Sequence, residues 1–148
     1  MIIDNYTAFS AIEGLLKEGH TVTLRTKGYS MLPFIVGGRD KVVLQQAVSW
    51  QKGDIVLAHL SEGRYVLHRI YRLSEEKVIL MGDGNLQATE CCKQSDIVGK
   101  AVQIIRDGRV VDCRAAGERW RARLWRWLLP LRRYIVWIYR RYANKRMY

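Results

Sequence analysis

Short segments in which apolar and polar residues alternate fill most of the chain between residues 21 and 112. Alternation with period two is typical of β-strands that turn one face toward a core. Glycine-containing turns such as Ser61-Glu62-Gly63 and Asp107-Gly108 separate the segments. The pattern predicts strands at residues 21–25, 41–44, 54–58, 64–70, 77–81, 97–105 and 109–111. We therefore expect a mostly β chain, folded as a coiled antiparallel sheet or small barrel.

A short helix is expected before the first strand. Asp4 or Asn5 can cap it, and Gly19 marks its end. Its apolar residues recur at helical spacing, at Phe9, Ile12, Leu15 and Leu16. Because this segment lacks a basic start and a long apolar run, we expect neither a signal peptide nor a membrane span there.

The net charge of +11 lies almost entirely in the last 35 residues. Residues 114–148 contain ten arginines and one lysine against a single acidic residue, Glu118. The chain is therefore predicted to consist of a β domain, residues 1–113, and a basic helical tail, residues 114–148. Such a tail needs an acidic partner, and anionic lipid and nucleic acid are the usual ones.

Apolar residues of this tail form a stripe at steps of three and four, which predicts an amphipathic helix. Its members are Trp120, Leu124, Trp127, Leu128, Leu131, Tyr134, Ile135, Ile138 and Tyr142. Pro130 should kink or divide the helix. The uncharged runs are too short to span a bilayer, so we expect the stripe to lie in the surface of an anionic membrane. Two alternatives are nucleic-acid binding and packing of the helix on its own domain.

The three cysteines, Cys91, Cys92 and Cys113, are an odd number without the spacing of a zinc site. We expect reduced thiols, no metal and no cofactor. Reduced thiols and a missing export signal favour a peripheral protein on the cytoplasmic face of a membrane.

Three residues could carry chemistry: Ser30, His68 and Asp83, which lies in a turn between two glycines. Ser30 lies between Gly28 and Pro33 after a predicted strand, and His68 lies within one, whereas His20 and His59 have nothing specific around them. Taken singly, each is more easily explained as a turn or strand residue.

The order of five motifs changes that interpretation. They are Ser30-Met31-Leu32-Pro33, Gly53-Asp54-Ile55-Val56, Leu67-His68-Arg69-Ile70, Gly82-Asp83-Gly84-Asn85 and Asp96-Ile97-Val98-Gly99-Lys100-Ala101. In content and order they resemble the signal peptidase I family and its LexA-like serine peptidase relatives, over roughly residues 21–105. Histidine followed by arginine resembles the archaeal and endoplasmic-reticulum branch, which uses a histidine base.

The resemblance implies a catalytic set of Ser30 as nucleophile, His68 as base and Asp83 as the carboxylate that orients His68. A histidine with a pKa of about 6.5 is a competent base at neutral pH, whereas a lysine must first be desolvated. Backbone N–H groups near Ser30 would hold the oxyanion. The residues expected to bind the oxyanion or the substrate are Gly28, Tyr29, Met31 and Pro33.

The chain departs from the family pattern in three places. Gly28 stands where many signal peptidases have an oxyanion-binding serine, and Tyr29 replaces a small or polar residue. The N-terminal membrane anchor is missing, so we expect the tail, through Trp120, Leu124, Trp127, Leu128, Leu131, Ile135 and Ile138, to replace it.

The leading hypothesis is a membrane-associated serine endopeptidase that cleaves a peptide or protein precursor. Two alternatives stay open: a weakly active or inactive peptide-binding module of the same fold, and a LexA-like regulator that cleaves itself.

Overall fold

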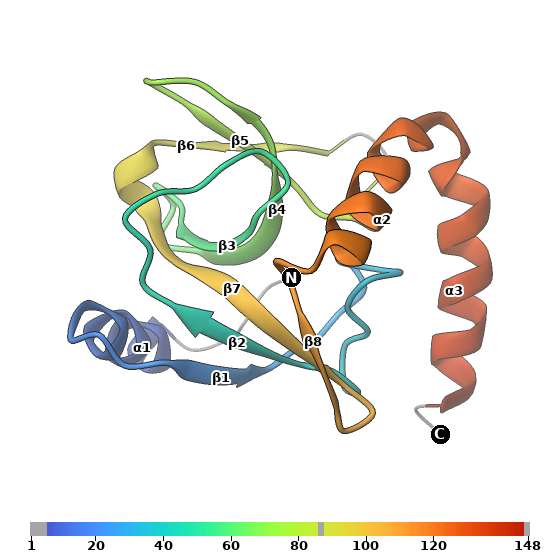
Figure 1. Cartoon of the computed structure of the whole chain (residues 1–148), viewed down its shortest axis with the longest axis horizontal. Helices are drawn as coiled ribbons and strands as arrows, with labels where there is room; N and C mark the ends of the chain where they lie inside the picture. Colours follow the sequence, from blue (N-terminus) through green and yellow to red (C-terminus); the bar gives the residue numbers. More distant parts are fainter. Residues whose placement is uncertain (1–5, 86–87, 147–148) are drawn as a thin grey trace.

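The computed structural model describes residues 6–85 and 88–146. It contains an N-terminal helix, eight strands and a C-terminal pair of helices (Figure 1). The strands are β1 (Val22–Arg25), β2 (Lys41–Gln45), β3 (Ile55–His59), β4 (Tyr65–Leu73), β5 (Val78–Met81), β6 (Glu90–Cys92), β7 (Ile97–Arg106) and β8 (Arg109–Asp112). The helices are α1 (Tyr6–Lys17), α2 (Ala116–Trp127) and α3 (Arg132–Arg146), with short 3₁₀ turns at Gln94–Asp96 and Leu129–Leu131. The mostly β fold class is confirmed.

All strands belong to one antiparallel sheet in the order β1-β2-β7-β3-β4-β5-β6, with β8 paired to β7. Three register shifts, one each in the β2–β7, β3–β7 and β4–β5 ladders, interrupt the regular pairing. Such irregularities bend strands and increase twist, which fits the coiled shape in Figure 1. The seven predicted strands are all present, whereas β6 was not predicted.

The sheet has an apolar cluster on each face, and β4 contributes to both. Tyr65 and Leu67 belong to one cluster, which also holds residues of α1, β2, β7 and the C-terminal helices. Val66 and Ile70 belong to the other, which holds residues of β3, β5 and β6. In residues 65–70 of β4, before the register shift with β5, odd-numbered residues therefore face the first cluster and even-numbered residues face the second.

The predicted N-terminal helix is confirmed as α1. Phe9 and Leu16 are buried in the first cluster, Ile12 packs against it, and Leu15 is exposed. Phe9 also stacks on Tyr65 of β4, with ring centroids 4.7 Å apart. The proposed caps Asp4 and Asn5 lie outside the described residues.

Pro130 divides the C-terminal segment into two helices, as predicted. The two helices lie side by side at one end of the sheet (Figure 1). They pack on the β domain through a face that the predicted stripe does not include: Ala122, Trp125, Arg132 and Val136 are buried. Packing of this segment on its own domain, one of the alternatives left open, is therefore present. The domain boundary at residues 113 and 114 stays a prediction.

The predicted stripe lies mostly on the outside of this helical pair. Trp120, Leu124, Trp127, Leu131 and Ile138 are exposed, and Trp127 keeps 81% of its surface. Leu128 and Ile135 are half-buried and line a groove of about 680 Å³ between the two helices and the loop that follows β1. No helix in the described part of the chain is long and apolar enough to cross a membrane.

Candidate active site

The loop between β1 and β2, residues 26–40, carries Ser30 and is tied at its two ends. The buried Thr26 hydroxyl donates to the Asp40 carbonyl at 2.8 Å. The buried Asp40 carboxylate in turn accepts from the Val36 N–H at 2.8 Å. These contacts fix where the loop leaves and re-enters the sheet. Ser30 therefore lies on a loop whose ends are held, and it is half-buried.

The turn after β5 packs directly on the backbone of the serine loop. The Gly84 N–H donates to the Ser30 carbonyl at 2.7 Å. A Cβ atom on Gly82 would overlap the Ser30 carbonyl oxygen, and one on Gly84 would overlap that of Tyr29. The Gly82-Asp83-Gly84 turn therefore needs both glycines for this close backbone approach, which positions Ser30.

His68 brings its imidazole to Ser30 from the middle of β4. Its Nε2 lies 3.2 Å from Ser30 Oγ. The pairing of His68 with Val56 in the β3–β4 ladder fixes its position along the sheet, and the side chain is 3% exposed. A buried ring within hydrogen-bond distance of a serine hydroxyl has the geometry of a general base and its nucleophile.

Glu90 of β6 contacts the other ring nitrogen. Its Oε2 lies 2.5 Å from His68 Nδ1. When the proton is on Nδ1, the Nδ1–H donates a hydrogen bond to Glu90. Nε2 can then accept a hydrogen bond from the Ser30 hydroxyl. Serine, histidine and glutamate thus form a chain of hydrogen bonds of the kind that activates a nucleophile.

The protonation of this chain suits a base at neutral pH. Burial lowers the pKa of His68 below 6.5, and the hydrogen bond to Glu90 opposes part of that effect. The same hydrogen bond lowers the pKa of Glu90. At pH 7 the structure therefore holds a neutral imidazole beside an ionised carboxylate.

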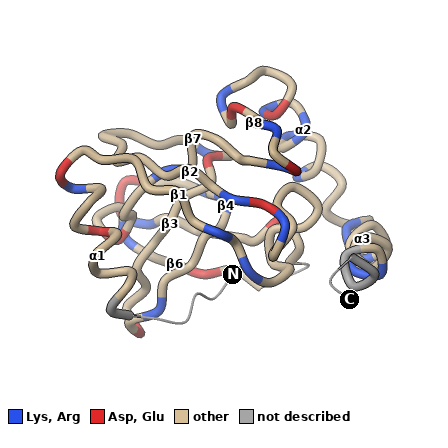
Figure 2. The backbone as a smooth tube through the Cα atoms, turned by 90° about the horizontal axis from the view of Figure 1, so that it is seen from below, with Lys and Arg blue, Asp and Glu red and all other residues tan. Residues whose placement is uncertain are grey.

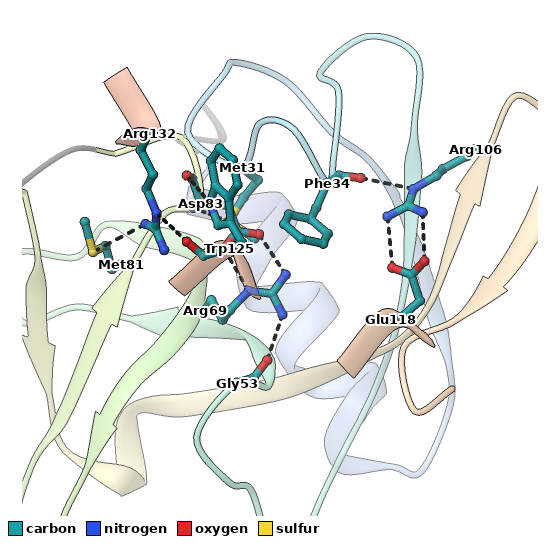
Figure 3. Close-up of polar contacts among 10 residues, drawn as sticks. All are labelled: Met31, Phe34, Gly53, Arg69, Met81, Asp83, Arg106, Glu118, Trp125 and Arg132. Atoms are coloured by element: carbon teal, nitrogen blue, oxygen red, sulfur yellow. Dashed lines mark hydrogen bonds and ion pairs between the residues drawn. The ribbon is translucent and has the colours of Figure 1, made fainter. Parts of the chain in front are cut away.

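The expected role of Asp83 needs correction. Its carboxylate binds the Arg69 guanidinium in a bidentate way, at 2.8 Å from Nε to Oδ1 and 2.7 Å from Nη2 to Oδ2 (Figure 3). Arg69 also donates to the Gly53 carbonyl at 2.8 Å. The carboxylate at the second nitrogen of His68 is that of Glu90, so Asp83 supports the turn beneath Ser30.

Strand alternation explains this division. His68 and Arg69 are neighbours on β4 and therefore point to opposite faces of the sheet. Glu90 alternates with Cys92, which is buried in the second apolar cluster on the same face as His68. Asp83 continues the alternation of β5 on the face of Met81, which pairs with Arg69. The two carboxylates are therefore directed to different partners.

The other predicted site residues lie around Ser30 with different exposures. Gly28 adopts a positive φ of 83°, a conformation in which a side chain would be strained. Tyr29 and Pro33 are half-buried, and Pro33 lines the groove beside the helical pair. The Met31 side chain is buried in the core and its sulfur accepts from the Asp83 N–H at 3.5 Å. Only the backbone of Met31 can therefore serve an oxyanion site.

The remaining candidates are placed elsewhere. His59 stacks on Tyr65, and His20 lies beside Glu18. The cysteines are free thiols, and burial raises the pKa of Cys113 to about 11. Among the described residues, no group of histidine, cysteine and acidic side chains could hold a metal ion.

Comparison with known families identifies the group to which the chain belongs. A model of the Peptidase S24-like family matches residues 2–111. The chain therefore belongs to this family, within the signal peptidase and LexA group of serine peptidases. A search of curated proteins gave no match. Membership supports a serine peptidase or LexA-like regulator at the level of the family. The histidine-base branch stays a prediction.

Glu90 is the site residue that sequence reasoning missed. It lies on a strand of three residues, too short for alternation to be recognised, and no motif surrounds it. One usable signal was the alternation of side chains along β4. His68 and Arg69 are neighbours and point to opposite faces of the sheet, so they cannot both face Asp83.

Replacing Glu90 by glutamine tests its role. Wild-type reactivity toward a fluorophosphonate should rise with pH through a pKa below 6.5 and level off near neutrality, because only neutral His68 accepts the proton. Glu90→Gln should lower the plateau by about 100-fold and move the acid limb to lower pH, since the carboxylate raises the pKa of His68. The measurement is the labelling rate constant between pH 4.5 and 8.

Asp83→Asn is the matched control. Asp83 raises the pKa of His68 less than Glu90 does, because it acts through its charge alone and Glu90 also accepts a hydrogen bond. The acid limb should therefore move less in Asp83→Asn than in Glu90→Gln. A larger shift in Asp83→Asn than in Glu90→Gln would contradict the assignment of Glu90.

Proposed function

We propose that this protein is a membrane-associated serine endopeptidase that cleaves a peptide or protein precursor. The observation that carries the proposal is the chain of contacts from Ser30 Oγ to His68 Nε2 at 3.2 Å and from His68 Nδ1 to Glu90 at 2.5 Å. The family match supports the same chemistry at a coarser level.

The steps follow from this geometry. Ser30 Oγ attacks the scissile carbonyl as its proton passes to His68 Nε2, and the carbonyl oxygen becomes an oxyanion. Glu90 stabilises the imidazolium, which then gives its proton to the leaving amine as the C–N bond breaks. Water, deprotonated by His68, attacks the acyl-Ser30 ester, releasing the acid and restoring the Ser30 hydroxyl.

The substrate class is inferred from the family relationship. Signal-peptidase-like enzymes cleave extended segments beside small residues, and a peptide lying along the serine loop would meet the half-buried Tyr29. A bulky residue at that position favours a small side chain next to the scissile bond. Leader removal from a secreted or modified peptide is a role that fits these features.

Alanine substitution of the nucleophile and the base tests the proposal. Ser30→Ala should abolish fluorophosphonate labelling, and His68→Ala should slow it by about 10²–10⁴-fold. Ser61→Ala and His59→Ala are the controls, since both residues lie on the β3–β4 hairpin, and both variants should label like the wild type. Labelling of Ser30→Ala at the wild-type rate would refute the assignment of Ser30.

A LexA-like self-cleaving regulator is the second candidate, because the family match is compatible with it. The same Ser30 would then attack a peptide bond of its own chain. Incubating the purified protein and measuring its intact mass separates the two: fragments absent from Ser30→Ala favour self-cleavage, and an unchanged mass favours a separate substrate. A peptide-binding module without turnover would keep its intact mass and would not be labelled at Ser30 by the fluorophosphonate.

Membrane attachment through the C-terminal helices is part of the proposal. Trp120, Trp127 and Ile138 keep 65%, 81% and 46% of their surfaces exposed. Figure 2 shows basic positions along α2 and α3, and the side chains at these positions would meet lipid phosphates. The three free thiols favour the cytoplasmic face.

Flotation with vesicles of anionic phospholipid tests this attachment. Replacing Trp120, Trp127 and Ile138 together by serine should move the protein from the vesicle fraction to the soluble fraction, because their apolar area no longer enters the lipid. A deletion of the helices is unsuitable, since Trp125 and Val136 belong to the core.

The control is the replacement of Val48 and Val110 by serine, exposed apolar residues outside the tail. It should float like the wild type. Equal flotation of the two variants would contradict attachment through the tail. Wild-type protein that binds nucleic acid and does not float with the vesicles would contradict it as well.

A further inference from the structure

A second hollow lies behind the active site, between the sheet and α2. Its volume is about 440 Å³, within the range of small-molecule sites. Part of its wall is apolar and includes Phe34, Ile55 and Ile104. Neither Ser30 nor His68 lines it, so the cavity is separate from the reacting groups.

The carboxylates that line this cavity are already paired with basic residues. Asp83 binds Arg69. Asp54 lies 3.2 Å from Lys100, and Glu118 lies 3.2 Å from Arg106. These pairs neutralise the acidic side of the lining, and Arg114 of the lining pairs with Asp112. Within the described ranges, Arg126 and Arg132 of the lining have no carboxylate within 4.0 Å.

Arg132 is the most unusual of these cations. It is 3% exposed, yet among the described residues no carboxylate lies within 4.0 Å of it. Its guanidinium contacts neutral groups: Nε donates to the Trp125 carbonyl at 3.3 Å and Nη1 lies 3.8 Å from Met81 Sδ (Figure 3). It also stacks over the Trp125 ring. Burying a cation among neutral partners is unfavourable, and an anion that binds it removes part of this cost.

Arg126 adds a second cation to the same lining. Its guanidinium lies 4.6 Å above the Tyr71 ring, and among the described residues it too has no carboxylate within 4.0 Å. Burial lowers the pKa of both arginines; the Asp83 carboxylate opposes part of this effect on Arg132, whereas the nearby cations Arg69 and Arg126 add to it. Lys52 and Arg123 also line the cavity. The site therefore carries an excess of positive charge in a partly enclosed hollow.

We infer that this cavity binds an oxyanion, a phosphate or a carboxylate, carried on an apolar group, with Arg132 and Arg126 holding the oxyanion. Guanidinium groups match the geometry of both oxyanions and bind them with strong charge-assisted hydrogen bonds. The apolar wall formed by Phe34, Ile55 and Ile104 accommodates the rest of the molecule. This site does not depend on peptidase activity.

Titration calorimetry on the full chain tests the site with three probes: inorganic phosphate, dihexanoyl phosphatidic acid below its micelle concentration, and octanoate. Saturable binding of the phosphatidic acid, tighter than that of inorganic phosphate, is expected because only the lipid also fills the apolar wall. Octanoate binding instead would assign the site to carboxylates, and equal affinities for phosphate and phosphatidic acid would show that the apolar wall is not used.

Arg132→Gln and Arg126→Gln should each weaken this binding by about tenfold or more, the loss of one charge-assisted hydrogen bond. Arg140→Gln is the matched control, since Arg140 is exposed on α3 outside the cavity lining, and its affinity should equal that of the wild type. If Arg132→Gln does not fold, Arg126→Gln still tests the site, because Arg126 is only half-buried. Absence of saturable binding to all three probes, or equal weakening by Arg126→Gln and Arg140→Gln, would overturn the inference.

Discussion

The alternation of side chains along β4 is the constraint on which the site depends. Adjacent residues of a strand point to opposite faces, so His68 and Arg69 cannot share a partner. His68 faces Ser30 and Glu90, whereas Arg69 faces Asp83 and the C-terminal helices. One strand thus carries the reacting base on one side and, on the other, the ion pair that holds the Gly82-Asp83-Gly84 turn against the Ser30 backbone. The imidazole of His68 and the Arg69–Asp83 ion pair therefore lie on opposite faces of the sheet.

The C-terminal helices extend this support. Trp125 donates its indole N–H to the Asp83 carbonyl at 2.8 Å, and its ring packs edge-on against Phe34 of the serine loop. Burial of a tryptophan in a core contributes several kcal/mol of stability, as the cost of truncating it to alanine shows. The helices therefore belong to the structure that holds Ser30, and they keep a separate exposed apolar surface, which includes Trp120 and Trp127, on the opposite side.

Most of the fold could be predicted from the sequence because alternation and glycine turns are local signals. The seven strands followed from these signals, α1 followed from apolar residues at helical spacing, and the break in the tail followed from Pro130. The ordered motifs singled out Ser30 and His68. Two features depended on long-range geometry. The three-residue strand β6 has no pattern of its own, so Glu90 stayed hidden. In the tail, the larger exposed residues formed the evident stripe, whereas the buried face combines Ala122, Trp125 and the charged Arg132, which hydropathy does not group together.

Nitrogen-15 NMR of the histidine rings shows whether Glu90 or Asp83 holds the imidazole of His68. With Glu90 as the partner, His68 should be neutral at pH 7 with its proton on Nδ1. That proton should resonate far downfield because of the short bond to Glu90. The signal should be lost or move strongly upfield in Glu90→Gln and persist in Asp83→Asn. A proton on Nε2, or a downfield signal lost only in Asp83→Asn, would show that Glu90 does not hold the imidazole.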